Sequence, residues 1–143
     1  MKLKALFSFA VKLGMEADPR PMSELKAMLA KRKKAYEKME EDEKKYYDLE
    51  ALENPFDDSR ILHAENPEAD IKIILTGIDM EGAEILLAAE LGRRGQKIDL
   101  VLTHHPEGRA LLGLGDVMDQ QNSIMEECGV PINVAEKLMT PRM

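Results

Sequence analysis

The first part of the chain has apolar residues at helical spacing. Leucine, phenylalanine and alanine side chains recur over residues 3–13, and Gly14 then stands where a helix commonly ends. After a proline-rich connector, a second apolar stripe predicts a longer helix from about Ser23 to Leu49, although Arg32 and Glu43 interrupt it. The sequence therefore predicts two helices in this part, the second with an incomplete apolar face.

The pattern further along the chain is typical of alternating strands and helices. Residues 71–76 are rich in β-branched side chains and predict a strand, residues 80–94 predict a helix with one apolar side, and residues 98–103 predict a second strand. A strand, a helix and a strand in so short a stretch form a βαβ unit with parallel strands. Residues 129–134 predict a third strand, which has Pro131 near its start or lies at a sheet edge.

Two clusters of turn-forming residues, at positions 54–60 and at Asn66-Pro67, separate these two patterns. We therefore expect a helical N-terminal extension over residues 1–62 and an α/β domain over residues 63–143. The expected fold class is α/β, with a mixed sheet based on the βαβ unit. No stop signal follows residue 134, which is typical of a domain truncated at its C-terminal end.

The strand predicted at residues 98–103 runs directly into two adjacent histidines, His104 and His105, and then Pro106. Ligands of open α/β sheets collect at the carboxyl ends of the strands, and neutral imidazole suits zinc, iron, nickel or copper. Consecutive strand residues point to opposite faces, so the two histidines would serve different ions of a close pair unless the turn at Pro106 brings them together. The alternative is that one histidine packs and the other is solvated.

Asp79 follows the first predicted strand and has two interpretations. The commoner use of such a residue is as the N-cap of the following helix. The other is as a metal ligand or as a hydrogen-bond acceptor that orients an imidazole, because neighbouring parallel strands would bring Asp79 toward His104.

Two charged residues beyond the histidine pair are also open to two interpretations. Arg109 either binds an anionic substrate or pairs with Glu107. Asp116 fits a favourable position at the N-terminus of a helix, and the alternative is a role as a substitute metal ligand.

The charge distribution bears on which partners the chain would bind. The net charge is −7; residues 1–60 contain 13 basic and 13 acidic side chains, and residues 61–143 contain 7 and 14. The whole imbalance therefore surrounds the histidine pair, where it favours cations and opposes nonspecific phosphate binding. We expect no nucleic-acid partner.

The sequence also bears on cellular location. No apolar run approaches the roughly 18 residues that a membrane span needs, so we expect no membrane partner. The chain has one cysteine, Cys128, which rules out an internal disulfide and is compatible with a reducing compartment. These features favour a cytoplasmic protein.

The segment IDLVLTHHPEG, residues 98–108, preceded by a strand and an amphipathic helix, resembles the N-terminal portion of the family named for NGG-interacting factor three. Some members of that family are described as type 2 GTP cyclohydrolases. The resemblance covers about residues 71–143 and implies an α/β fold, a toroidal hexamer and a dinuclear metal centre whose first two ligands are His104 and His105. The family's later ligands, an Asp and a His-x-x-x-Glu, have no counterpart here, so the sequence resembles a truncated member or one part of a split protein.

These observations predict a dinuclear-metal-binding protein, with zinc or iron as the expected divalent ion and a homo-oligomer as the expected assembly. As an enzyme it would be a metal-dependent hydrolase, in which the ions lower the pKa of a bound water and polarise a substrate oxygen. The sequence does not identify the small-molecule substrate. The alternative is a non-enzymatic metal-binding or regulatory assembly protein that uses its N-terminal helices for interactions. Nucleotide binding is a weaker hypothesis, because the glycines at 108, 113 and 115 match neither a P-loop nor a dinucleotide fingerprint.

Overall fold

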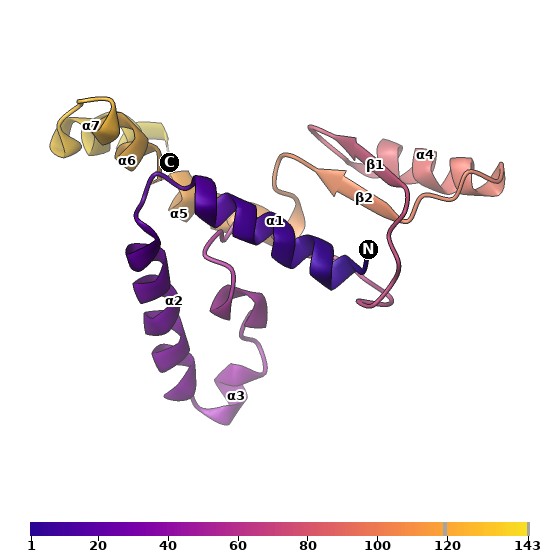
Figure 1. The fold of residues 1–143 in the computed structure, drawn as a ribbon, viewed down its shortest axis with the longest axis horizontal. Coiled ribbons are helices and arrows are strands. Elements are labelled where there is room, and N and C mark those ends of the chain that lie inside the picture. The colour runs from indigo at the N-terminus through magenta and orange to yellow at the C-terminus, as the bar shows by residue number, and fades with distance from the viewer. Residues whose placement is uncertain (119, 143) are drawn as a thin grey trace.

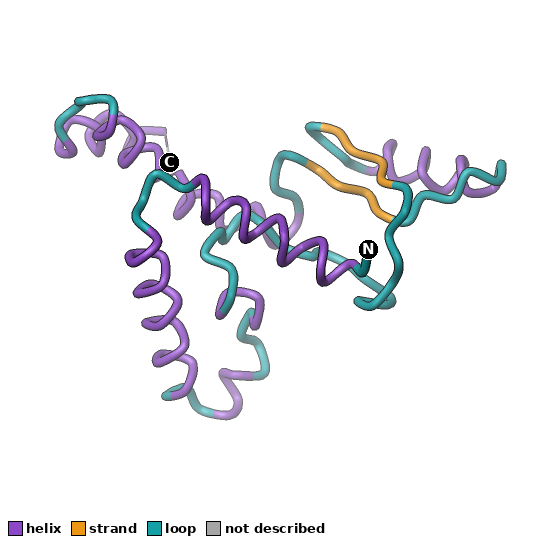
Figure 2. Tube along the Cα trace, viewed as in Figure 1, coloured by secondary structure: helices purple, strands orange, loops and turns teal. Residues whose placement is uncertain are grey.

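Helices form most of the computed structural model, which describes residues 1–118 and 120–142 (Figures 1 and 2). The α-helices are α1 (Leu3–Ala17), α2 (Met22–Glu37), α3 (Glu41–Lys44), α4 (Gly82–Arg93), α5 (Leu114–Met118), α6 (Gln120–Glu127) and α7 (Ile132–Met139). The 3₁₀ turns are η1 (Leu49–Leu52), η2 (Gly108–Gly113) and η3 (Thr140–Arg142), and the strands are β1 (Ile74–Gly77) and β2 (Leu100–Thr103).

The predicted α/β fold with a mixed sheet is wrong. In the described residues the sheet consists of two short parallel strands, β1 and β2, and the rest of the regular structure is helical. The strand–helix–strand order is present locally: α4 lies between the strands in sequence, and Ile74 pairs with Leu100 through to Gly77 with Thr103. This pair is too small to form the layered sheet that defines an α/β domain.

The third strand predicted at residues 129–134 is absent, because this stretch begins helix α7 instead. Gly129 has a φ of 88° and ends the preceding helix, and Pro131 is the N-cap of α7. Proline suits a helix start because its φ is already fixed near the helical value. Ala135 and Met139, four residues apart, are the buried side chains of α7. A short apolar run cannot be assigned to strand or helix by periodicity alone, which explains the error.

The two N-terminal helices differ from their predicted bounds in opposite directions. Helix α1 continues past Gly14 to Ala17, and a Cβ atom at Gly14 would lie 2.9 Å from the ring of Phe56. Gly14 therefore lies inside the helix, where it lets the ring of Phe56 pack closely, and it does not end the helix. The long helix predicted at 23–49 is divided into α2, α3 and η1, and the rings of Tyr36 and Tyr47 meet across the resulting reversal, with centroids 4.9 Å apart.

The start of the chain is paired with the segment that leads into β1. The amide of Leu3 donates to the carbonyl of Ala69 at 3.0 Å, and the amide of Ile71 donates to the carbonyl of Met1 at 2.7 Å. Lys2 and Asp70 form an antiparallel bridge and an ion pair of 2.9 Å. These bonds attach α1 to the strand pair, so contacts cross the boundary expected near residue 62, and the division into two domains stays a prediction.

The chain buries little of its apolar surface. Its accessible surface is 10251 Å², whereas a compact monomer of 16.1 kDa would expose about 7,400 Å². Among the described residues, the buried hydrophobic side chains are Leu3, Leu25, Ile71, Met80, Ala110, Ala135 and Met139. Stability of this open arrangement (Figure 1) therefore depends on polar contacts between segments more than on one central core.

The closest of these inter-segment approaches is at Gly113, and it gives a stability prediction. A Cβ atom there would lie 2.4 Å from the carbonyl oxygen of Asp57, which is backbone and cannot move aside cheaply. We predict that Gly113→Ala lowers the free energy of unfolding by about 1–3 kcal/mol. Gly115→Ala is the control, because nothing lies within 4 Å of its Cβ position and alanine favours helix α5. Urea unfolding of both variants checks this, and equal stability of the two would contradict it.

Candidate metal site at the histidine pair

His104 and His105 lie directly beyond the carboxyl end of β2, and hydrogen bonds extend the strand pairing to both of them. The amide of His104 donates to the carbonyl of Gly77 at 3.0 Å, and the amide of His105 donates to the carbonyl of Ile78 at 2.9 Å. The hydroxyl of Thr103 lies 2.9 Å from the carbonyl oxygens of both Ile78 and His105. The backbone of both histidines is therefore attached to the end of β1 and to Ile78, which follows it.

The two imidazole rings are neighbours in spite of the strand geometry. Their centroids are 5.2 Å apart and their planes are inclined by 35°. Consecutive residues of a regular strand would point to opposite faces, but the backbone bends at His104 and His105, beyond the end of β2, and the rings lie together. Of the two arrangements expected for the pair, this is the one that permits both rings to face one site.

Asp79 contacts one of these imidazoles and does not cap helix α4. Its Oδ1 lies 2.7 Å from Nδ1 of His105, and both side chains are more than half exposed. The N-cap of α4 is Glu81, which forms a reciprocal capping box with Glu84. The expected N-cap role of Asp79 is therefore wrong, and its imidazole partner is His105, where proximity to His104 was expected.

The contact with Asp79 determines which nitrogen of His105 can bind an ion. A carboxylate only accepts hydrogen bonds, so Nδ1 of a neutral His105 carries the proton and Nε2 has the free lone pair. Metal-binding histidines are commonly oriented in this way by a carboxylate. The donor set thus fits two imidazole ligands of a transition metal. Among the described residues, however, no three His, Cys, Asp or Glu side chains are arranged to hold one ion. The side chain of Asp116, a possible extra ligand, lies outside what the structure describes.

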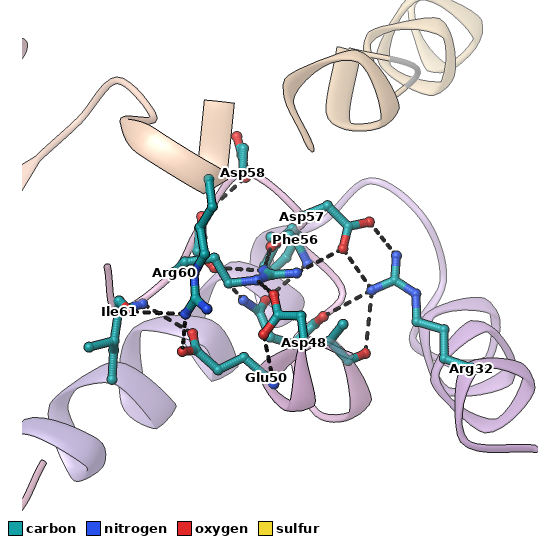
Figure 3. A network of polar contacts seen from close by, with 12 residues as sticks. Arg32, Asp48, Glu50, Phe56, Asp57, Asp58, Arg60 and Ile61 are labelled. Atoms are coloured by element: carbon teal, nitrogen blue, oxygen red, sulfur yellow. Dashed lines mark hydrogen bonds and ion pairs between the residues drawn. The ribbon is translucent and has the colours of Figure 1, made fainter. Parts of the chain in front are cut away.

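A second polar cluster, centred on Arg60, lies in the segment between α3 and β1 (Figure 3). The side chain of Arg60 is 4% exposed and donates to the carboxylates of Asp48 and Asp57. It also donates to the carbonyl oxygens of Phe56 and Ser59. Burial alone would lower the pKa of Arg60, but the two carboxylates raise it above its usual value. A buried charge requires such pairing, so Arg60 fixes the path of this segment.

Arg32 connects helix α2 to the same cluster. Its guanidinium contacts both carboxylate oxygens of Asp57 and approaches the carbonyls of Ala51 and Asn54 at 3.4 and 3.3 Å (Figure 3). This explains why Arg32 interrupts the apolar stripe of its helix: the side chain serves a contact that is far away in sequence.

Arg109 belongs to turn η2, which follows the histidines, and its ion-pair partner is Glu50, where Glu107 was expected. It donates to Oε1 of Glu50 at 2.9 Å and to the carbonyl of Ile61 at 3.0 Å. The other oxygen of Glu50 accepts from the amide of Ile61 at 3.0 Å. The expected pair with Glu107 is therefore wrong, whereas binding of an anionic substrate by Arg109 stays a prediction. Neither Glu50 nor Arg60 belongs to a local sequence motif that would predict these contacts. The one signal in the sequence is the unusual density of charge in Asp57-Asp58-Ser59-Arg60.

Comparisons with protein-family models, curated proteins and solved structures found no match to this chain. The resemblance to the family of NGG-interacting factor three thus stays an interpretation of the residues around the histidine pair. None of the helices in the described residues combines the length and the apolar composition that a membrane-spanning helix requires.

The Arg60 cluster gives a prediction for stability at acid pH. Burial alone would raise the pKa of Asp48, but Arg60 outweighs it and holds that pKa below the usual value of 3.8. The carboxylate therefore stabilises the fold above that value, and this contribution is lost as pH falls through the lower pKa of the folded state. We predict that Asp48→Asn lowers unfolding free energy by about 2 kcal/mol at pH 7.

The same substitution should remove part of the acid sensitivity, so the difference between wild type and Asp48→Asn should shrink below about pH 4. Asp58→Asn is the control, because the carboxylate of Asp58 accepts a hydrogen bond from the neighbouring Ser59 hydroxyl. Urea unfolding at pH 7, 5 and 3 measures these differences. A constant difference at all three values would contradict a role for the charge of Asp48.

Proposed function

We propose that the chain binds a divalent transition metal, zinc or iron, through His104 and His105, and that this pair is half of a dinuclear centre. The observation that supports this is the contact between Asp79 and Nδ1 of His105, which leaves Nε2 free beside a second imidazole. The acidic surroundings of residues 61–143 favour a cation at this place.

The reaction that we propose for such a centre is metal-assisted hydrolysis of a small molecule, as the resemblance to type 2 GTP cyclohydrolases implies. A bound ion would supply Lewis acidity toward a substrate oxygen and toward water. The chain's own contribution is to orient the imidazoles: Asp79 accepts a hydrogen bond from the ring of His105, and the carbonyls of Gly77 and Ile78 accept from the backbone of the pair. A single cysteine and the absence of a long apolar run in the sequence support a cytoplasmic location.

Titration calorimetry with Zn²⁺ tests the metal proposal. Zinc sites use at least three protein ligands, so we predict weak binding to the isolated chain, reduced by His104→Ala and by His105→Ala. Asp79→Asn should weaken binding by up to about tenfold, because the ring of His105 is then less well oriented. His63→Ala is the matched control, since His63 is exposed and far from the pair in sequence. Unchanged affinity in the double mutant of His104 and His105 would refute the proposal.

The second candidate function is assembly, and the open face of the strand pair supports it. In the observed register Ile74 and Leu102 share one face, with exposed fractions of 42% and 50%, while Leu75 and Val101 share the less exposed face. Parallel strands are normally covered on both faces. The accessible surface of the chain is also larger than that of a compact monomer by more than the roughly 800 Å² per partner that a specific interface buries. We propose that a second copy of the chain covers this face.

We predict that the purified chain self-associates and that Leu102→Lys shifts it toward monomer by placing a charge on this face. Leu138→Lys is the control, because Leu138 is 49% exposed but lies on α7, at the other end of the molecule (Figure 1). Sedimentation at several concentrations measures the association. A wild-type chain that remains monomeric throughout would contradict the assembly proposal.

A further inference from the structure

The loop after the histidine pair is held against the N-terminal extension by several independent contacts. Arg109 bonds to Glu50 and Ile61, and Gly113 leaves no room for a Cβ atom against the backbone of Asp57. Between them, Ala110 is 2% exposed. Turn η2 therefore rests on the segment that the Arg60 cluster makes rigid.

Glu50 is the residue that joins the two sides of this contact. One carboxylate oxygen accepts from Arg109 in turn η2, and the other accepts from the amide of Ile61 in the N-terminal extension. The pair is partly exposed, with side-chain exposures of 49% for Arg109 and 27% for Glu50. The ion pair between Arg109 and Glu50 therefore positions the loop more than it stabilises the whole fold.

Arg109 is close enough to His105 in sequence for its position to restrict the backbone of the histidine pair. Pro106, Glu107 and Gly108 separate His105 from Arg109, and a chain of that length spans only about 14 Å when fully extended. The proline also restricts the backbone of His105. The contact between Asp79 and His105 joins two exposed side chains and would not by itself hold the ring in place. It needs a backbone that is fixed on both sides.

Hydrogen bonds to Gly77 and Ile78 fix the pair on the strand side. We propose that Glu50 and Arg109 fix it on the loop side and are positioning residues for the imidazole of His105. The helical extension thus sets the orientation of the candidate metal ligand, although it contributes no ligand itself. The effect on metal affinity rests on the proposed function, whereas the effect on the orientation of His105 does not.

The test measures the ring of His105 directly, in the absence of metal. Nitrogen NMR of the neutral imidazole distinguishes the Nδ1-protonated form, which the contact with Asp79 favours, from the Nε2-protonated form. Arg109→Ala and Glu50→Gln should each increase the ratio of the Nε2-protonated to the Nδ1-protonated form by about two- to fivefold, the range for loss of one exposed ion pair. Amide hydrogen exchange at His104 and His105 should accelerate by a similar factor. Arg94→Ala is the control, because it breaks a comparable ion pair with Glu90 on α4.

A conservative variant keeps the test decisive if Arg109→Ala loses stability. Arg109→Lys keeps the positive charge and donors toward Glu50 and the Ile61 carbonyl, so its ratio of ring forms should lie closer to the wild-type value than that of Arg109→Ala. Such a partial rescue supports the proposal. A ratio that is unchanged in Arg109→Ala, or shifted equally in Arg109→Lys, overturns it.

Zinc titration of the same variants separates this proposal from the proposed function. Weaker Zn²⁺ binding by Arg109→Ala than by Arg94→Ala, together with the shift in ring forms, supports both. A wild-type chain that binds no Zn²⁺ while Arg109→Ala still shifts the ring forms would refute the metal proposal and leave the positioning role supported. Zinc binding by the wild-type chain, together with ring forms that do not shift in Arg109→Ala, would support the metal proposal and refute the positioning role.

Discussion

The arrangement of this chain depends on the buried guanidinium of Arg60. With few hydrophobic side chains buried among the described residues, the segments cannot be held by one apolar core. Arg60 instead gathers Asp48, Asp57 and two backbone carbonyls around itself, and Arg32 of α2 binds the same Asp57. Because a buried charge is tolerated only when it is paired, this cluster specifies the path of the chain between α3 and β1.

The rest of the molecule is built outward from that segment. Helix α1 packs Gly14 against Phe56, and η2 packs Gly113 against Asp57, so two glycines let distant parts of the chain approach the same short stretch. The strand pair is attached separately, through the bonds of the first three residues to the segment before β1. Such an arrangement leaves broad apolar surface exposed, including one face of the strands.

The contact between Asp79 and His105 depends on the parallel pairing of β1 and β2. The carboxyl ends of β1 and β2 lie together, so Asp79 from one strand end meets His105 from the other. That contact selects a nitrogen on one imidazole, and the bend at His104 and His105 leaves the second imidazole beside it. The pair thus offers one imidazole oriented by Asp79 and a second beside it, and further ligands would have to complete a metal centre. The helical extension contributes by holding the loop that follows the pair.

The sequence by itself determined the local features of this site. Patterns over a few residues predict β1, α4 and β2, and β2 ends at Thr103, ahead of Pro106. Only the tertiary structure decided the rest. Whether Asp79 caps a helix or orients His105, and whether Arg109 meets Glu107 or Glu50, depends on contacts between residues 26 and 59 positions apart, which no local pattern encodes. The same holds for residues 129–134, where a short apolar run suits strand or helix equally. Packing of Ala135 and Met139 makes it the start of a helix.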